Sequence, residues 1–188
     1  VVRRLSVTLI NFKTMETIVK TKWSVDKAHT EIGFKVKHMM ISSVRGKFND
    51  FDLIVESERE DFENAEIKFS AKVDSIDTNN RDRDNHLRSD DFFNAAEYPE
   101  LKFKSKSFDG EKLIGDLTIR DITKEIVLDV DFNGVVIDPY GQTKAGFQIK
   151  GDLNRKGFGL SWSAVTEAGS IVVGDKVELL IEVQLIHS

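Results

Sequence analysis

The chain has 188 residues, of which 40% are hydrophobic and 31% charged, with a formal net charge of −5 at pH 7 and no cysteine. This length suffices for one domain with a buried core, and the acidic balance argues against a nucleic-acid partner, which needs a basic surface. The absence of cysteine excludes disulfides, thiolate nucleophiles and cysteine-ligated metal centres. No apolar run approaches the roughly 18 residues of a transmembrane helix.

The N-terminal residues have only part of a targeting pattern. Two arginines precede the apolar run Leu5–Ile10, which is shorter than the roughly 7–15 residues of a signal-peptide core and is not followed by a small-residue cleavage site. We therefore predict that the natural chain starts at Met15, that residues 1–14 are an upstream extension, and that residues 15–188 form one cytoplasmic domain. The two arginines leave a periplasmic or exported location open as the alternative.

Apolar residues at every second position are the main pattern along the rest of the chain. They predict β-strands near residues 32–37, 51–55, 67–73, 126–132, 144–151 and 177–186. Turn signals separate these runs, for example Asp109-Gly110, Asn133-Gly134 and Gly174-Asp175. Short strands divided by turns, each with one polar face, are typical of an all-β sandwich or barrel.

Two segments interrupt the alternation. Residues 56–66 are acidic and are predicted to form a loop or a short helical turn. In residues 79–99, Asn79 or Asn80 can cap a helix that runs from Arg81 towards Asp90, with acids in its first turn.

The predicted helix is too polar to be part of the core. Its Asp84 and Arg88 stand four residues apart with the acid first, which is the favourable order for a helical ion pair. We expect the helix to lie across a sheet edge or a barrel mouth, with apolar contacts made by Leu87, Phe92 and Phe93.

The sequence offers little support for metal binding or catalysis. Asp82 and His86 could share one helical face, but zinc needs three or four ligands and no two histidines have the required spacing. A capped, salt-bridged helix explains this segment better. No nucleophile elbow and no glycine-rich phosphate loop is present, so we predict no catalytic residue, metal or cofactor.

The chain is rich in phenylalanine, with thirteen in all. Most of them are expected to fill a core. A closed barrel of about eight strands can either pack its interior or hold one ligand, and alternation does not distinguish a packed core from a cavity wall.

Several motifs together resemble the YceI-like family of lipocalin-like, polyisoprenoid-binding proteins. The resemblance covers residues 23–185 and includes, in order, WSVDKAHTEIGFKVKHMMISSVRGKFNDFD, IDTNNRDRDNHLRSDDFFNAAEYPELKF, GDLTIRDITKEIVLDVDF, DPYGQTKAGF, NRKGFGLSW and VVGDKVELLIEV. The departures from the family pattern are mild: Asp121, Tyr140 and Gly157 stand where glycine, tryptophan and aspartate are common. None of them falls on an apolar wall position.

This resemblance implies an extended antiparallel barrel of about eight strands with an apolar interior, the short helix near residues 81–90 lying over it. It implies a non-enzymatic protein that binds, stores or transports a long-chain isoprenoid or a fatty amphiphile, and a homodimer. From alternation, the residues expected to contact the ligand in the tube are Phe34, Val36, Phe48, Phe69, Phe92, Phe93, Phe103, Leu117, Ile119, Leu128, Val130, Phe147 and Trp162. Polar contacts at the mouth are expected from Arg83, His86 and Arg88.

Two alternatives stay open at this point. An enzyme on a lipid-like substrate would use His29, His38 or His86 as a general base, which requires a histidine that points into the tube. A stress-related structural or interaction protein would instead have a filled core.

Overall fold

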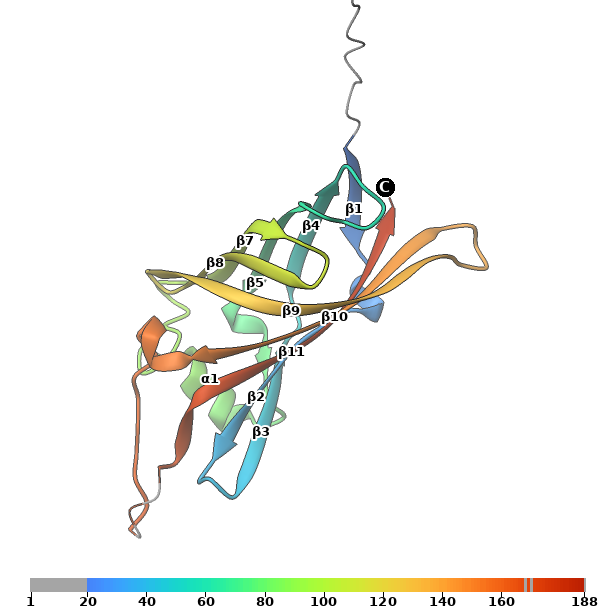
Figure 1. The fold of residues 1–188 in the computed structure, drawn as a ribbon. Coiled ribbons are helices and arrows are strands. Elements are labelled where there is room, and N and C mark those ends of the chain that lie inside the picture. Colours follow the sequence, from blue (N-terminus) through green and yellow to red (C-terminus); the bar gives the residue numbers. More distant parts are fainter. Residues whose placement is uncertain (1–19, 168, 170, 188) are drawn as a thin grey trace, which may run out of the picture.

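A computed structural model describes residues 20–167, 169 and 171–187. The proposed upstream extension, residues 1–14, lies outside the described residues. Within the described part the chain contains β-strands, one α-helix and three short 3-10 helices (Figure 1).

The strands are β1 (Thr21–Val25), β2 (Glu31–His38), β3 (Ser42–Phe48), β4 (Phe51–Ser57), β5 (Glu66–Lys72), β6 (Ile76–Asp77), β7 (Glu100–Phe108), β8 (Lys112–Ile119), β9 (Ile122–Ile137), β10 (Thr143–Asn154) and β11 (Val173–His187). The helix α1 spans Arg81–Arg88, and the 3-10 helices are η1 (Lys27–His29), η2 (Val73–Ser75) and η3 (Arg155–Phe158).

Eight strands close into an antiparallel barrel in the order β1-β4-β5-β7-β8-β9-β10-β11, because β1 pairs with β11 as well as with β4. The long strand β11 pairs with β10 along one edge and with two strands, β1 and β2, along the other. Its C-terminal end pairs with β1, where Trp23 lies opposite His187. Its N-terminal half pairs with β2, where Val36 lies opposite Val177, and β2 leads on to β3 and β6. The predicted all-β barrel of about eight strands is confirmed.

Alternation places the apolar residues inside the barrel. In β8 every second residue from Leu113 to Ile119 is buried, whereas Ile114, Asp116 and Thr118 are half-buried. The same period of two runs along β4, β7 and β9, because successive side chains of a strand point to opposite faces of the sheet. The interior of the barrel is therefore an apolar core to which every long strand contributes.

The acidic loop between β4 and β5 contributes one large side chain to this core. Phe62 is 1% exposed and lies within 5.5 Å, between ring centroids, of Trp23, Phe132 and Phe147. The sequence predicts the loop correctly but does not predict that Phe62 folds back into the barrel. This aromatic cluster fills the barrel at the end where β1 pairs with β11.

The helix α1 is capped as predicted, because the Asn80 side chain accepts a hydrogen bond from the Arg83 N–H at 2.9 Å. It ends at Arg88, two residues before Asp90. The predicted ion pair between Asp84 and Arg88 is wrong, since each side chain bonds to the chain segment that precedes the helix.

Asp84 is 7% exposed and accepts hydrogen bonds from the N–H (3.0 Å) and hydroxyl (2.5 Å) of Thr78. Arg88 donates to the carbonyls of Asp74 and Ile76 at 3.0 and 2.8 Å. The charges of the helix thus attach it to the barrel and do not pair with each other.

Candidate functional site

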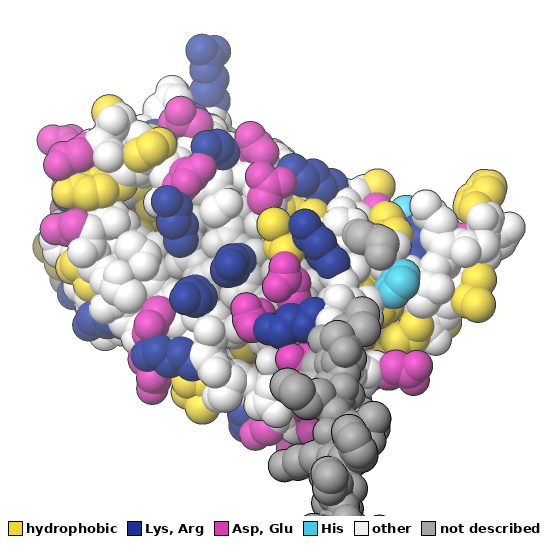
Figure 2. All heavy atoms as spheres, turned by 90° about the horizontal axis from the view of Figure 1, so that it is seen from above, with side chains coloured by type: hydrophobic (Ala, Val, Ile, Leu, Met, Phe, Trp, Pro, Cys, Tyr) yellow, Lys and Arg dark blue, Asp and Glu magenta, His cyan; other side chains and the backbone are white. Residues whose placement is uncertain are grey.

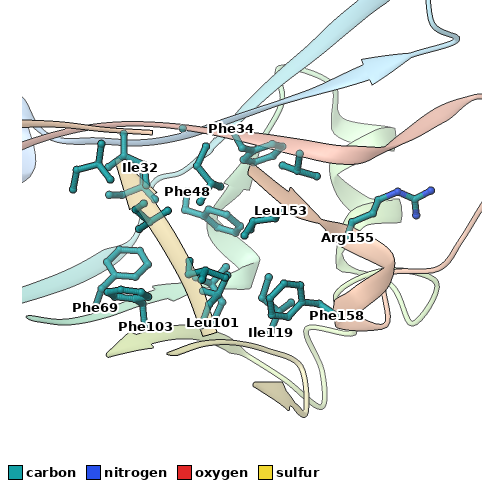
Figure 3. A pocket seen from close by; sticks show the side chains of 18 of the residues that line it. Ile32, Phe34, Phe48, Phe69, Leu101, Phe103, Ile119, Leu153, Arg155 and Phe158 are labelled. Atoms are coloured by element: carbon teal, nitrogen blue, oxygen red, sulfur yellow. The ribbon is translucent and has the colours of Figure 1, made fainter. Parts of the chain in front are cut away.

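A cavity of about 200 Å³ lies inside the barrel. Strands β2 to β5, β7 to β11, the helix α1 and the segment after η3 all contribute to its wall. Apart from Gly33 and Arg155, every lining residue has an apolar side chain. Figure 3 shows the aromatic and aliphatic side chains of the wall pointing into this space. The arrangement is that of a site for an apolar molecule.

Two glycines make room for aromatic rings of the wall. Gly46 lies opposite Phe34 in the β2–β3 pair, and a Cβ atom at Gly46 would overlap the Phe34 ring. In the same way, a Cβ at Gly115 would overlap the ring of Phe103 on the neighbouring strand. A ring laid over a glycine stays close to the sheet, so both side chains leave the centre of the barrel free.

Ten of the thirteen predicted tube residues line the cavity. They are Phe34, Val36, Phe48, Phe69, Phe92, Phe93, Phe103, Leu117, Ile119 and Leu128. The helix footing predicted from residues 79–99 is also present, because Leu87, Phe92 and Phe93 all reach the cavity wall. Contact of these residues with a ligand stays a prediction.

The other three predicted tube residues lie elsewhere. Val130 and Phe147 line a smaller apolar cavity of about 50 Å³, which shares several wall residues with the larger one. Trp162 lines neither cavity; its ring lies 5.4 Å from that of Phe92 and 4.9 Å from that of His86. Trp162 follows η3 and belongs to no strand, so alternation says nothing about its direction.

None of the three predicted mouth residues, Arg83, His86 and Arg88, is part of the cavity wall. Arg83 donates to the hydroxyl and the carbonyl of Thr78, each at 2.7 Å. Arg88 holds backbone carbonyls before the helix, as described above. The Nε2 of His86 lies 2.9 Å from the carboxylate of Asp91. These side chains fasten α1 to its neighbours.

The cavity wall does include one charged residue, Arg155, which we did not predict. Its side chain is 3% exposed. The aliphatic part faces the cavity, and the guanidinium group turns away from it (Figure 3). The alternation of β10 through Gly151 and Leu153 extends to position 155, and this signal could have found an inward-facing arginine.

The guanidinium group of Arg155 joins two segments of chain. It donates to the carbonyls of Leu160 (2.5 Å), Trp162 (2.8 Å) and Gly174 (2.9 Å), and to the Asp175 carboxylate (3.2 Å). Burial lowers the pKa of the Arg155 guanidinium, and Asp175 partly opposes that shift. Arg155 remains a cation at any physiological pH, and its donors are already occupied by the protein.

No group of three histidine, cysteine or carboxylate residues able to hold a metal exists among the described residues. The hypothetical pair of Asp82 and His86 therefore lacks a third ligand. His29, His38 and His86 are all absent from the cavity wall. No described helix is long and apolar enough to cross a membrane.

Comparison with known proteins gives a family match over most of the chain. The model of the YceI-like domain matches residues 23–185. The UPF0312 protein SERP2314 of Staphylococcus epidermidis is 38% identical over 159 residues, which cover 84% of this chain and 93% of that protein. The UPF0312 protein SA2479 of Staphylococcus aureus matches with the same identity and coverage.

Solved structures share the fold. The Campylobacter jejuni YCEI protein is 36% identical with a TM-score of 0.68, over 87% of this chain and 96% of that one. BcnA of Burkholderia cenocepacia has a TM-score of 0.71 at 19% identity, over 85% and 98% of the two chains. A polyisoprenoid binding domain from Saccharophagus degradans has a TM-score of 0.66 at 13% identity, over 88% and 98%. The last two show likeness of fold alone.

Proposed function

The chain belongs to the YceI-like family, and from this premise we propose that it binds a long-chain isoprenoid or a related amphiphilic lipid inside the barrel, for storage or transport. The observation that carries the proposal is the apolar cavity, whose wall has no free polar side chain. The polyisoprenoid binding domain of Saccharophagus degradans, which shares the fold, supports the choice of ligand class.

The size of the cavity bears on how such a chain is held. An apolar cavity of about 150 Å³ binds benzene, so a space of about 200 Å³ accepts at least one short aliphatic segment without movement of the wall. Each further buried CH₂ group contributes about 0.8 kcal/mol. A ligand of many isoprene units is longer than this space, and we propose that rings such as Phe34, Phe69 and Phe103 change rotamer to admit it.

The head group of the lipid is proposed to stay outside the cavity. A polar group inside would find no free partner, because the donors of Arg155 already bind backbone carbonyls and Asp175. Among Arg83, His86 and Arg88, His86 is the best candidate for a head-group contact. Among the described residues, the imidazole ring of His86 has one hydrogen-bond partner, the half-exposed carboxylate of Asp91, whereas both arginines hold backbone carbonyls of the segment before the helix.

The two alternative functions have less support. An enzyme with His29, His38 or His86 as general base needs one of these rings beside the ligand, and none of them lines the cavity. A filled core is at odds with a continuous cavity of about 200 Å³.

Native mass spectrometry of the freshly purified protein tests the proposal. We expect adducts whose mass matches an isoprenoid or fatty amphiphile and which organic solvent extracts. Leu117→Trp, which fills the cavity, should abolish the adduct, and Thr118→Trp on the neighbouring, outward-facing position should retain it. A clean apo mass with no extractable lipid contradicts the proposal.

The homodimer and the cytoplasmic location remain proposals of ours. Sedimentation velocity of the purified protein distinguishes a monomer from a dimer. Fractionation of the native cell distinguishes cytoplasm from periplasm.

A further inference from the structure

The β2–β3 hairpin ends in an exposed apolar turn. Met40 is 62% exposed and Ile41 82%. A second exposed apolar pair, Val165 and Ile171, forms a short antiparallel bridge nearby. The two turns are joined because the N–H of Met39, next to Met40, donates to the carbonyl of Val172, next to Ile171, at 2.9 Å. Figure 1 shows both turns at the end of the molecule opposite the C-terminus.

The backbone of the first turn is unfavourable for its residues. Ile41 N–H donates to the His38 carbonyl at 3.2 Å, and the two residues between them, Met39 and Met40, have φ of 47° and 60°. Hairpin turns with both central residues at positive φ strongly prefer Asn-Gly. Left-handed backbone is costly for any residue other than glycine, asparagine or aspartate, because the Cβ atom comes too close to a carbonyl oxygen, and such outliers point to function. Folding alone does not explain two methionines here.

The charge of this hairpin differs from that of the chain. Residues 32–49 contain four basic side chains and no aspartate or glutamate, although the whole chain carries −5. The basic residues are Lys35, Lys37, Arg45 and Lys47. Lys35 and Lys47 have ion-pair partners in Glu178 and Glu31, whereas no described carboxylate pairs with Lys37 or Arg45. The hairpin thus combines an apolar tip with uncompensated positive charge.

The cavity wall reaches almost to this tip. Val36 lines the cavity and lies two residues before His38, where the turn begins. His38 pairs with Val173 of β11, which also lines the cavity. A surface that receives the tip would therefore lie next to one end of the cavity.

We propose that the β2–β3 turn docks the protein on an anionic lipid bilayer, with Met40 and Ile41 inserted among the acyl chains and Lys37 and Arg45 at the phosphate level. An apolar tip flanked by basic residues is the arrangement by which proteins bind anionic membrane surfaces. This docking is a second activity, and it is independent of whether the cavity binds a lipid.

The β9–β10 hairpin offers a matched control. Its Val136 and Ile137 are 63% and 73% exposed, close to the values for Met40 and Ile41. Its charge is opposite, because residues 129–143 contain three aspartates and no lysine or arginine. Figure 2 shows this projecting hairpin with its apolar side chains, and basic and acidic side chains interspersed over the rest of that face. An anionic surface should repel it.

Sedimentation with vesicles of phosphatidylcholine, with and without phosphatidylglycerol, measures the docking. We expect the protein to bind the anionic vesicles at 0.1 M salt and to be released at 1 M, where the Debye length falls from about 10 to about 3 Å. Met40→Ser/Ile41→Ser should lower the partition about tenfold or more, and Val136→Ser/Ile137→Ser should leave it unchanged. Lys37→Gln/Arg45→Gln should lower it about thirtyfold, a factor of about five for each charge.

Two further variants separate docking from folding. Met39→Asn/Met40→Gly suits the turn, so the thermal midpoint of this variant should rise by roughly 2–4 °C, while its vesicle binding should weaken because the Met40 side chain is absent. Because the chain has no cysteine, Ile41→Cys and Ile137→Cys each accept a single polarity-sensitive dye. On anionic vesicles the dye at position 41 should shift to shorter emission wavelength, and the dye at position 137 should not.

Each opposite result overturns the proposal. Wild-type protein that stays in the supernatant with anionic vesicles shows that the tip does not dock. Equal losses for the two serine pairs show that any binding is not specific to this hairpin. Self-association that Met40→Ser/Ile41→Ser abolishes, without vesicle binding, assigns the tip to a second copy of the chain. The sedimentation and dye measurements use vesicles free of isoprenoid, so a negative result there leaves the proposed cavity function untouched.

Discussion

The ring of Phe34 lies over Gly46, the residue opposite it on the neighbouring strand. This pair shapes the cavity wall. Because Gly46 has no side chain, the Phe34 ring can lie flat against the sheet and does not project into the cavity. The methyl group of Thr78 also approaches the position of a Cβ at residue 46. The glycine therefore matters to the fold and to the cavity at once.

Gly46→Ala is expected to push the Phe34 ring into the cavity. Overpacking of this kind costs about 1–3 kcal/mol, which urea unfolding measures, and it should reduce the lipid adduct in native mass spectra. Gly146→Ala is the control, since the nearest atom to a Cβ there is 3.6 Å away. If Gly46→Ala keeps both its stability and its lipid adduct, the cavity wall can accommodate the extra methyl group, and the prediction is wrong.

Arg155→Leu is expected to destabilise the protein by at least about 2–3 kcal/mol. The change leaves the carbonyls of Leu160 and Trp162 without their donor, and hydrogen bonds to a charged group contribute about 1.5–3 kcal/mol each. The denaturation midpoint in urea gives the loss. Lys156→Leu provides the comparison, because Lys156 also pairs with Asp175 (3.0 Å) but is 43% exposed, and it should cost about 0.5 kcal/mol or less. Similar losses of unfolding free energy in the two variants would show that the burial of Arg155 does not increase its contribution to stability.

Asp26 is expected to contribute to the pH dependence of stability. Burial by itself raises the pKa of this carboxyl group, but the hydrogen bonds from Lys144 and His29 outweigh burial and hold the pKa below its ordinary value of 3.8. The side chain also accepts a hydrogen bond from Gln184 at 3.1 Å. A depressed carboxyl pKa means that the folded state favours the ionised form. The stabilisation is therefore complete above about pH 3.8 and is lost as the pH falls through the lower, folded-state value.

Asp26→Asn should accordingly cost about 1–3 kcal/mol at neutral pH, and its deficit against the wild type should shrink below pH 3.8. Unfolding in urea at a series of pH values tests this. Asp52→Asn serves as the control, because Asp52 is 76% exposed and its ion pair with Lys27 lies at the surface. A deficit that is constant across acidic pH would rule out the proposed linkage.

Asp84 is expected to hold α1 on the barrel. Asp84→Ala removes the acceptor of the Thr78 N–H and should cost about 1–3 kcal/mol. Hydrogen exchange at the Thr78 amide should accelerate with it. Asp82→Ala on the same helix removes an exposed acid from the first turn and should cost only a few tenths of a kcal/mol up to about 1. Slow exchange at Thr78 in Asp84→Ala would show that another group protects this amide.

Part of this structure could be predicted because it depends on local periodicity. The alternation in residues 126–132 determines which face of β9 is apolar, and a barrel interior is the place where such a face is buried. The Asn80 cap follows from the same kind of local rule, since its hydrogen bond spans three residues. Ten of the thirteen tube residues lie on the cavity wall for this reason.

Other features depend on which distant segments meet. Closure of the barrel rests on the pairing of Trp23 with His187, at opposite ends of the described chain. Phe62 sits in an acidic loop with no periodicity, and its contacts with the rings of Trp23, Phe132 and Phe147 explain its burial. The sequence predicts Arg83 and Arg88 at a mouth, but both bind carbonyl groups of the segment that precedes the helix.

The amino-acid sequence by itself determined the fold class, the apolar faces of the strands and the position and cap of the helix. These follow from the two-residue and 3.6-residue periods of neighbouring side chains. Only the tertiary structure decided that the interior keeps a cavity, that Arg155 borders it with its charge turned away, and that Met40 and Ile41 stand exposed beside its end. The physical reason is that free volume and hydrogen-bond partners depend on contacts between residues far apart in the chain, which no local pattern encodes.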